Sequence, residues 1–427
     1  MKAELFYLST SMNIKKFLKR LGPGFITGAA DDDPSGIATY SQSGVQFGYG
    51  QLWTALFSFP FMAIVQEMCG RIGMVTGNGL SGVIRKHYPR SILGIAVFLL
   101  VAANTINIGA DFGAMASATQ MIFGLPFVFW LFALTLLTLG LEIFVSYPKY
   151  ARFLKYLTLS LFAYVAVAFV VKQDWGLIAA STFIPSFSWN KIYLLNIVAI
   201  LGTTISPYLF FWQADEEVEE EIEHHKITGI GEGQPRINKK DLRNMRIDTV
   251  LGMFFSNLVM LFIIMTAAST LRLHGITTIN TATEAAEALR PLAGNFTFLL
   301  FTLGILGTGM LAVPILAGSA SYAVAEAVGW RAGLYRKFKD AHGFYGVIVL
   351  ATIVGLVVNF LHIPPFKMLY YTAIFNGLAA PPLLVMILLI SNNKKIMGKY
   401  TNGRLSNILG IIIAGIMTAA GIAVLCW

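Results

Sequence analysis

Residues 28–40 read Gly-Ala-Ala-Asp-Asp-Asp-Pro-Ser-Gly-Ile-Ala-Thr-Tyr and interrupt an otherwise apolar segment over residues 21–45. A segment of that length can cross a bilayer. Each carboxylate of residues 31–33 costs roughly 2.5–3.5 kcal/mol at the centre of a membrane helix. Pro34 also lacks a backbone donor, and Gly36 permits non-helical backbone angles. We therefore predict a helix broken at mid-membrane, with carbonyls and at least one carboxylate turned into a polar cavity.

The alternative is a loop at the membrane edge, in which Asp33 caps a helix that begins at Pro34. Apolar sequence continues on both sides of the interruption. This continuity favours the broken helix.

The composition places the whole chain in a membrane. It has 427 residues, of which 56% are hydrophobic and 12% are charged, whereas a soluble domain carries about 25% charged residues. A net charge of +9 would indicate a nucleic-acid partner in a soluble protein, but here the placement of the cations decides its meaning. Apolar windows predict eleven membrane spans, at residues 22–46, 51–75, 91–118, 126–146, 153–172, 192–213, 247–271, 296–325, 344–361, 368–390 and 406–426.

The Lys and Arg residues are distributed asymmetrically between the connections of these spans. With the N-terminus placed in the cytoplasm, all but five of the 31 Lys and Arg residues fall on the cytoplasmic side. The five exceptions are Lys172, Lys191, Arg272, Arg290 and Lys367. The positive-inside rule then predicts a cytoplasmic N-terminus, an extracytoplasmic C-terminus and an odd number of spans. We expect the protein in the plasma (inner) membrane.

A second interruption follows five spans after the first. Residues 201–209 read Leu-Gly-Thr-Thr-Ile-Ser-Pro-Tyr-Leu, again with hydroxyls and a proline inside an apolar span. Interrupted segments at corresponding positions of two halves are typical of transporters built from inverted repeats. We predict one transmembrane domain over residues 1–427, with repeats at 21–172 and 191–390 and an extra helix at 405–427. Taken alone, the second interruption also fits a proline kink whose freed carbonyl is satisfied by Thr203 or Thr204.

Several motifs resemble the NRAMP family of divalent-metal transporters. They are the Asp-Pro interruption, span 6 over residues 202–209, Gly-Pro-Gly-Phe at 22–25, Phe-Gly-Tyr-Gly at 47–50, Arg-Ile-Gly-Met-Val-Thr-Gly at 71–77 and Asn-Lys-Lys-Ile-Met-Gly at 393–398. The resemblance covers most of the chain. It implies an all-α polytopic membrane protein of the LeuT-type fold, with a 5+5 inverted repeat and an eleventh helix. It also implies that helices 1 and 6 are unwound at mid-membrane around a metal site.

The chain departs from the family pattern at three places. The family's Asp-Pro-Gly-Asn is here Asp-Pro-Ser-Gly, so Gly36 replaces a ligating asparagine. The family's Met-Pro-His is Ser-Pro-Tyr at residues 206–208, and its Asp-x-x-Glu ends at Ala114 instead of a glutamate. This combination resembles the NRAMP-related magnesium transporter branch. That branch implies Mg²⁺ and Mn²⁺ uptake with weak or no proton coupling.

The chemistry of the expected ligands also favours Mg²⁺ and Mn²⁺. Carboxylate, carbonyl and hydroxyl oxygens suit Mg²⁺ and Mn²⁺, whereas a thioether favours softer metals. We predict Asp33 as a direct or water-bridged ligand, and the resemblance implies ligating carbonyls at Ala30 and Thr203. Ser206 is expected to contact the ion through water. Gly36 is expected to leave room for a partly hydrated ion, because Mg²⁺ gives up its water reluctantly.

The pathway candidates are Asp31, Asp32, Asp111, Tyr208 and Asn376. Asp31 and Asp32 cannot both face the same way as Asp33 on a regular helix. We expect one of them to line the approach path, with a paired structural role as the alternative. Asp111 is isolated at bilayer depth and is expected to line a cavity or to be paired. Asn376 lies in span 10, where it could reach the ion.

Two other charged features have simpler interpretations. Glu67 and Arg71 are four residues apart on span 2, which predicts an ion pair. The acidic run at 215–223 follows span 6 and is interpreted as a solvated helical extension. The alternative is a cation-attracting surface at the inner mouth or a weak inner metal site.

We predict a secondary importer of divalent cations, Mg²⁺ and Mn²⁺, that works by alternating access without stoichiometric proton coupling. One alternative is a proton-coupled Mn²⁺/Fe²⁺ symporter. Another is a sodium-coupled amino-acid transporter of the same fold, whose substrate carboxylate Asp33 would repel. Phosphate-binding, HExxH and nucleophile-elbow motifs are missing from the sequence, so we expect neither an enzyme nor a cofactor. The expected partners are the ion and the lipid bilayer, with no nucleic acid and no obligate protein partner.

Overall fold

The structure is a computed structural model that describes residues 22–145, 158–361 and 363–426. Every regular element within these ranges is a helix, and they contain no strand. The first half holds α2 (Pro23–Asp31), α3 (Pro34–Phe47), α4 (Trp53–Thr76), α5 (Leu80–His87), α6 (Arg90–Phe123), α7 (Phe127–Phe144), α9 (Phe162–Val170) and α10 (Trp175–Phe183). The second half holds α11 (Lys191–Thr204), α12 (Pro207–Glu223), α13 (Lys239–Ser269), α14 (Ala282–Ala286), α15 (Arg290–Ala293), α16 (Thr297–Val328), α17 (His342–Val358), α18 (Pro365–Asn392), α19 (Lys394–Met397) and α20 (Arg404–Leu425).

The predicted spans map onto these helices, although the lengths differ. By length and composition, eight stretches of the described chain are long and apolar enough to cross a membrane, or nine if one bent helix pair counts as a span. The first predicted span is divided between two short helices, α2 and α3. Part of the span predicted at 153–172 lies outside the described residues, and its described part contains α9. Within the described residues, the count falls below the predicted eleven because the first span is broken and the fifth is described only in part.

Both predicted helix breaks are present, and each lies directly before a proline. α2 ends at Asp31 and α3 begins at Pro34, while α11 ends at Thr204 and α12 begins at Pro207. Proline is favoured at the first helical position because its missing N–H is not needed there. Asp33 caps α3 by accepting a hydrogen bond from the backbone N–H of Gly36 at 2.8 Å. The breaks are two residues long, so Gly36 belongs to α3.

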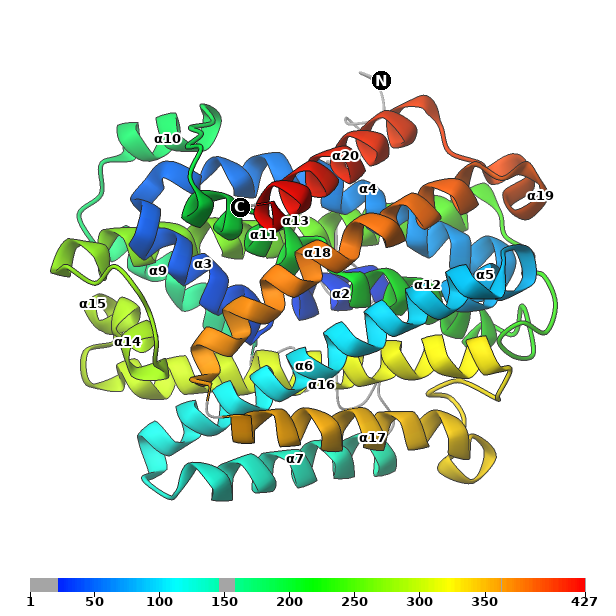
Figure 1. The fold of residues 1–427 in the computed structure, drawn as a ribbon, viewed down its shortest axis with the longest axis horizontal. Coiled ribbons are helices and arrows are strands. Elements are labelled where there is room, and N and C mark those ends of the chain that lie inside the picture. Colours follow the sequence, from blue (N-terminus) through cyan, green and yellow to red (C-terminus); the bar gives the residue numbers. More distant parts are fainter. Residues whose placement is uncertain (1–21, 146–157, 362, 427) are drawn as a thin grey trace, which may run out of the picture.

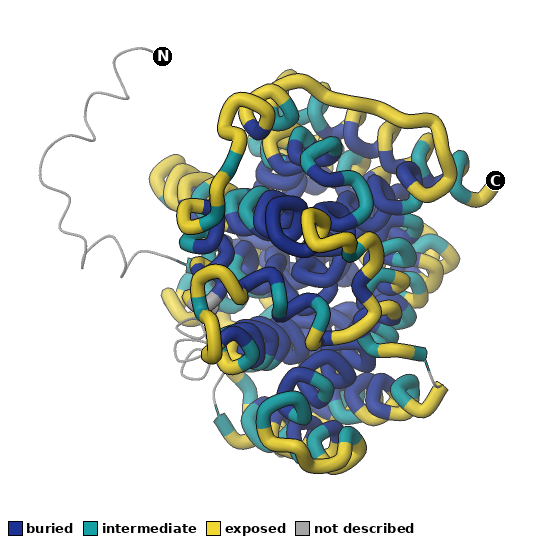
Figure 2. Tube along the Cα trace, turned by 90° about the vertical axis from the view of Figure 1, so that its left-hand side faces the viewer, coloured by how far each residue is buried: buried dark blue, intermediate teal, exposed yellow. Residues whose placement is uncertain are grey.

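The broken helices lie in the middle of the molecule, and long helices surround them. In Figure 1, α2 and α12 are near the centre, while α6, α16, α17 and α7 run along one side. α2 and α3 pack on α13, α12 packs on α4, and α11 packs on α18. The tube in Figure 2 is buried through its interior and exposed at the connections and along the outward faces of the peripheral helices. A site at the breaks is therefore enclosed by protein on all sides.

Glycines let the half-helices approach their neighbours at backbone distance. A Cβ atom on Gly28 of α2 would lie 2.3 Å from the carbonyl carbon of Gly252 in α13. A Cβ atom on Gly202 of α11 would lie 2.3 Å from the backbone nitrogen of Gly377 in α18. Contacts this short exclude any side chain, and they fix the positions of both breaks against continuous helices.

The predicted ion pair between Glu67 and Arg71 is confirmed. Their Oε1 and Nε atoms are 3.1 Å apart, and both side chains are at most 5% exposed. Arg246 of α13 also contacts Glu67 Oε1, at 2.7 Å. This second contact ties α4 to α13 and was not predicted.

The interpretation of residues 215–223 as a solvated extension is wrong. The run is helical, as the end of α12, but Asp215, Glu217 and Glu221 are at most 2% exposed. α12 packs between α4 and α16 there, and neighbouring groups supply donors to some of its carboxylates, namely those of Glu219 and Glu221. Lys226 Nζ, for example, lies 3.0 Å from Glu221 Oε1. Composition predicted solvent contact, whereas packing buries most of α12 and four residues of this run, Asp215, Glu217, Val218 and Glu221.

Candidate functional site

The two helix breaks face each other, as the paired interruptions predicted. The hydroxyl oxygens of Ser35 and Thr203 lie 3.3 Å apart, one on each side of the gap between the breaks. The Tyr208 hydroxyl donates a hydrogen bond to the carbonyl oxygen of Ala30 at 3.1 Å. Residues separated by more than 160 positions in the chain thus share one small region.

Asp33 is the carboxylate at the centre of this region. Its Oδ1 accepts hydrogen bonds from the Ser35 hydroxyl at 2.6 Å and from the Gly36 backbone N–H at 2.8 Å. Its Oδ2 accepts one from the side-chain amide of Asn107 at 2.9 Å. Asp33 is only 1% exposed, so its orientation is fixed by protein donors.

The sequence interpretation missed Asn107. Asn107 lies on α6, and its Oδ1 accepts a hydrogen bond from the Thr372 hydroxyl of α18 at 2.7 Å. α6 and α18 therefore hold Asp33 through one continuous chain of side chains. The only available signal was the presence of Asn104 and Asn107 inside an apolar span, where polar side chains are costly. The sequence does not reveal which of the two faces the break.

The side chains of Asp31 and Asp32 contact α13 instead of the region around Asp33. Ser256 of α13 lies with its hydroxyl 2.5 Å from Asp31 Oδ2 and 3.3 Å from Asp32 Oδ1. They link the end of α2 to α13, and both are at most 4% exposed. Within the described ranges, no three His, Cys, Asp or Glu side chains are grouped so that they could hold a metal ion. The three consecutive carboxylates do not form a shared cage.

The region beside Gly36 is closely packed. A Cβ atom on Gly36 would lie 3.2 Å from the Tyr40 ring, 3.3 Å from the Asp31 carbonyl oxygen and 3.5 Å from the Thr203 hydroxyl. The Ser206 hydroxyl lies 2.7 Å from the Thr203 carbonyl oxygen, to which it can donate. In this conformation, neighbouring groups fill the space expected for a hydrated ion.

Asp111 and Asn376 lie one helical turn beyond Asn107 and Thr372, the two side chains whose hydrogen bonds hold Asp33. Asp111 follows Asn107 by four residues on α6, and Asn376 follows Thr372 by four on α18, so each shares a face with its predecessor. Both are at most 1% exposed. Among the described residues, neither side chain has a hydrogen-bond partner. Unpaired polar groups at this depth mark a place that a proton, water or ion can satisfy.

The site is closed to solvent on both sides, since Ala30, Asp33, Thr203 and Ser206 are at most 1% exposed. It offers one carboxylate with carbonyl and hydroxyl oxygens around it. Oxygen donors of this kind suit a hard divalent cation.

Comparisons with known proteins agree with this architecture. The curated protein "Divalent metal cation transporter MntH" of Caldanaerobacter subterraneus subsp. tengcongensis is 25% identical over 418 residues, covering 95% of this chain and 92% of that protein. The crystal structure of the Eremococcus coleocola manganese transporter matches with a TM-score of 0.76 at 17% identity, over 97% of this chain and 88% of that chain. Mhp1, a nucleobase-cation-symport-1 family transporter, matches with a TM-score of 0.58 at 13% identity, over 95% of this chain and 90% of that chain.

These structural neighbours confirm the predicted LeuT-type fold. The family profile described as "Natural resistance-associated macrophage protein-like" matches residues 24–426, which is nearly the whole chain. The chain therefore belongs to the Nramp family.

Proposed function

We propose that this protein carries divalent metal cations across the membrane and binds them between the two helix breaks. The observation that carries the proposal is Asp33, a buried carboxylate in one break that lies next to Thr203 of the other through Ser35. A buried carboxylate inside a membrane is expensive and marks an ion pathway by default. The name of the curated MntH relative supports a divalent cation as cargo.

Mg²⁺ and Mn²⁺ are the proposed ions, as in the NRAMP-related magnesium transporter branch. The proposed ligands are Asp33, the carbonyls of Ala30 and Thr203, and Ser206 through water. All of these atoms are oxygen, which favours hard cations over soft ones. Gly36 adds no side chain to the site, which leaves a partly hydrated ion as the fitting cargo once the region widens.

Ion binding requires a rearrangement of the closed conformation. The Tyr208 hydroxyl occupies the Ala30 carbonyl, and the Tyr40 ring lies close to Gly36. We propose that α2, which ends at the first break, and α12, which begins at the second, move apart from the continuous helices to admit the ion. This movement is the alternating-access step expected for half-helices around a fixed site.

We propose that transport proceeds without stoichiometric proton movement, because Ala114 and Tyr208 stand where the family places titrating groups. One observation favours the alternative of a proton-coupled Mn²⁺/Fe²⁺ symporter. Asp111 is fully buried, and neither of its oxygens has a partner within the described part of the chain. An unpaired carboxylate is far cheaper neutral than ionised in such a place, so Asp111 is the candidate for binding a proton.

The membrane placement is also a proposal. The asymmetry of Lys and Arg supports a cytoplasmic N-terminus and an extracytoplasmic C-terminus in the plasma (inner) membrane. The presence of one helix break in each half supports repeats at 21–172 and 191–390, followed by the extra helix at 405–427.

The proposal is tested with the purified protein in proteoliposomes. Uptake of Mg²⁺, Mn²⁺, Ca²⁺ and Zn²⁺ is followed for the native chain, for Asp33→Ala and for Asp340→Ala, which removes an exposed carboxylate away from the breaks. We expect Mg²⁺ and Mn²⁺ uptake by the native protein and the Asp340 variant, and none by the Asp33 variant. Equal uptake by the Asp33 and Asp340 variants would show that Asp33 is not a metal ligand. Uptake no faster than in empty vesicles would refute the transport function itself.

A further inference from the structure

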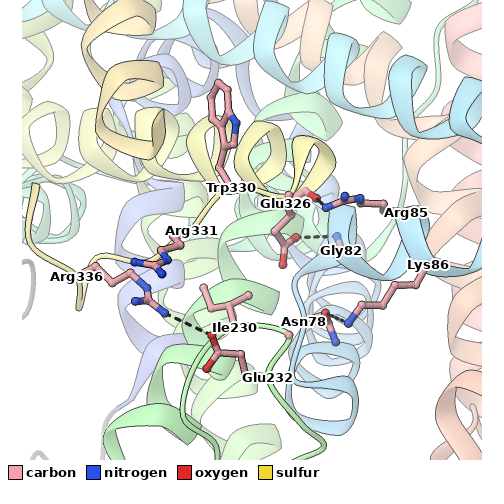
Figure 3. A pocket seen from close by; sticks show the side chains of 13 residues that line it. Asn78, Gly82, Arg85, Lys86, Ile230, Glu232, Glu326, Trp330, Arg331 and Arg336 are labelled. Atoms are coloured by element: carbon pink, nitrogen blue, oxygen red, sulfur yellow. Dashed lines mark hydrogen bonds and ion pairs between the residues drawn. The ribbon is translucent and has the colours of Figure 1, made fainter. Parts of the chain in front are cut away.

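A cavity of about 510 Å³ lies where three helix connections meet, away from the helix breaks. Its walls are residues 78–86 around the start and end of α5, residues 230–232 between α12 and α13, and residues 326–336 at the end of α16 and beyond. Figure 3 shows side chains from all three segments pointing toward one space. By the distribution of Lys and Arg, this end of the molecule is the cytosolic one.

Four cations line the cavity, namely Arg85, Lys86, Arg331 and Arg336. Two of them have neutral partners, since Lys86 Nζ donates to Asn78 Oδ1 at 2.6 Å and Arg85 Nη1 donates to the Glu326 carbonyl oxygen at 3.1 Å. Arg331 is exposed and makes no ion pair with any described residue. The four lining cations outnumber the two lining carboxylates, so the cavity keeps a net positive charge.

The two carboxylates of the lining, Glu232 and Glu326, offset only half of this charge. Glu326 accepts hydrogen bonds from the backbone N–H groups of Gly79 at 2.7 Å and Gly82 at 2.8 Å, so it is used to hold the start of α5. Glu232 has a side chain that is 57% exposed, and it lies 3.8 Å from Arg336 Nη2. An exposed pair at that distance contributes little.

We propose that this cavity binds a small phosphate-bearing anion from the cytosolic side. Arg and Lys are the residues that recognise phosphate, because their donors match its oxygens and several charges can be neutralised at once. With the two lining carboxylates counted, two positive charges remain, which a single carboxylate ligand does not neutralise and a di- or triphosphate does. The volume lies in the range of small-molecule sites, which favours a phosphate ester over a bare ion. A soluble phosphate ester and a phospholipid headgroup share this chemistry.

An anion bound in this cavity would contact several segments that move relative to one another in the proposed transport cycle. The walls belong to the connections that follow α4, α12 and α16, and α12 begins at the second helix break. A ligand that contacts both Lys86 and Arg331 would hold these connections together. Slower transport on ligand binding is the consequence. This consequence rests on the proposed transport function, whereas binding itself does not.

Binding is measured by isothermal titration of the detergent-purified full chain with ATP, pyrophosphate and inorganic phosphate, in EDTA so that no divalent ion is present. The test variant is Arg331→Gln with Arg336→Gln. The control is Lys239→Gln with Arg243→Gln, which removes the same charge from exposed positions of α13 outside the cavity. We expect the test variant to bind at least about ten-fold more weakly, because hydrogen bonds between charged groups are strong. The control is expected to bind like the native chain.

A second experiment tests whether the bound phosphate group belongs to a phospholipid. The melting temperature is compared in nanodiscs with and without an anionic phospholipid, for the same three proteins. A rise in melting temperature that only the test variant loses assigns the site to a headgroup. Equal binding by test and control variants overturns the proposal, and so does the lack of any effect in both arms. The Asp33→Ala protein must retain the anion site, so failure of transport and failure of this site remain distinguishable.

Discussion

Tyr208 and Ala30 are joined by a hydrogen bond of 3.1 Å that spans the two helix breaks, from the hydroxyl of one to the carbonyl oxygen of the other. Tyr208 is the second residue of α12, and Ala30 lies in the last turn of α2. The bond occupies a carbonyl that we propose as a metal ligand. This contact stabilises the closed conformation, and under the proposed ligand set it would compete with the ion for the carbonyl oxygen.

Removing this competitor should strengthen metal binding. In Tyr208→Phe the Ala30 carbonyl becomes available, and a hydrogen bond contributes about 0.5–1.5 kcal/mol net. We expect the Kd for Mn²⁺, measured by isothermal titration, to fall roughly two- to ten-fold. Tyr164→Phe is the control, because that buried hydroxyl has no hydrogen-bond partner among the described residues. Weaker Mn²⁺ binding by Tyr208→Phe would instead make the hydroxyl a ligand.

Asn107 should matter for affinity although we do not propose it as a ligand. It fixes Asp33 Oδ2 at 2.9 Å, and groups that orient a metal ligand typically change affinity by about 10- to 100-fold when removed. We expect Asn107→Ala to weaken Mn²⁺ binding by that factor while some transport persists. Asn104→Ala is the matched control, since Asn104 donates to Ser319 and to the Leu316 carbonyl instead. Equal losses in both variants would indicate a general packing defect.

Selectivity should follow the donor atoms at the breaks. Ser206→Met together with Gly36→Asn restores a thioether and an amide, and a thioether favours softer metals. We expect the ratio of Mg²⁺ to Mn²⁺ uptake to fall, and Cd²⁺ uptake to rise. Gly36→Ala controls for crowding, because even a Cβ atom there lies 3.2 Å from the Tyr40 ring. An unchanged Mg²⁺-to-Mn²⁺ ratio would show that ligand identity does not set selectivity.

Metal uptake is expected to carry no stoichiometric protons. Ala114 cannot titrate, and an ordinary tyrosine hydroxyl has a pKa of about 10. An inside-negative potential of roughly 100 mV contributes about 2.3 kcal/mol per charge, or about 4.6 kcal/mol for a divalent ion, which suffices for accumulation. The measurement uses proteoliposomes with an internal pH dye at a fixed potential.

Acidification that tracks Mn²⁺ uptake above a metal-free control would contradict this expectation. The Asp111→Asn variant then identifies the group responsible. If the variant takes up metal without acidification, Asp111 is the proton site, and the proton-coupled alternative becomes the correct mechanism.

The breaks and the Glu67–Arg71 pair were predictable because their causes are local. A proline lacks an N–H wherever it stands, and residues four apart on a helix are neighbours in any fold. The acidic run at 215–223 was not predictable in the same way. Its helical state follows from local sequence, but its burial depends on α4 and α16, which are distant in the chain.

The sequence by itself determined the membrane class, the family resemblance and the two interruptions that face each other in the fold. Tertiary structure alone decided the distant partners of the three aspartates: Asp33 contacts Asn107 and not Asn104, and Ser256 contacts Asp31 and Asp32. The physical reason is that membrane helices are apolar around most of their circumference. Hydrophobic periodicity therefore does not reveal which face turns inward. Only the packing of α6 and α13 against the broken helix places one polar side chain, and not its neighbour, within hydrogen-bonding distance.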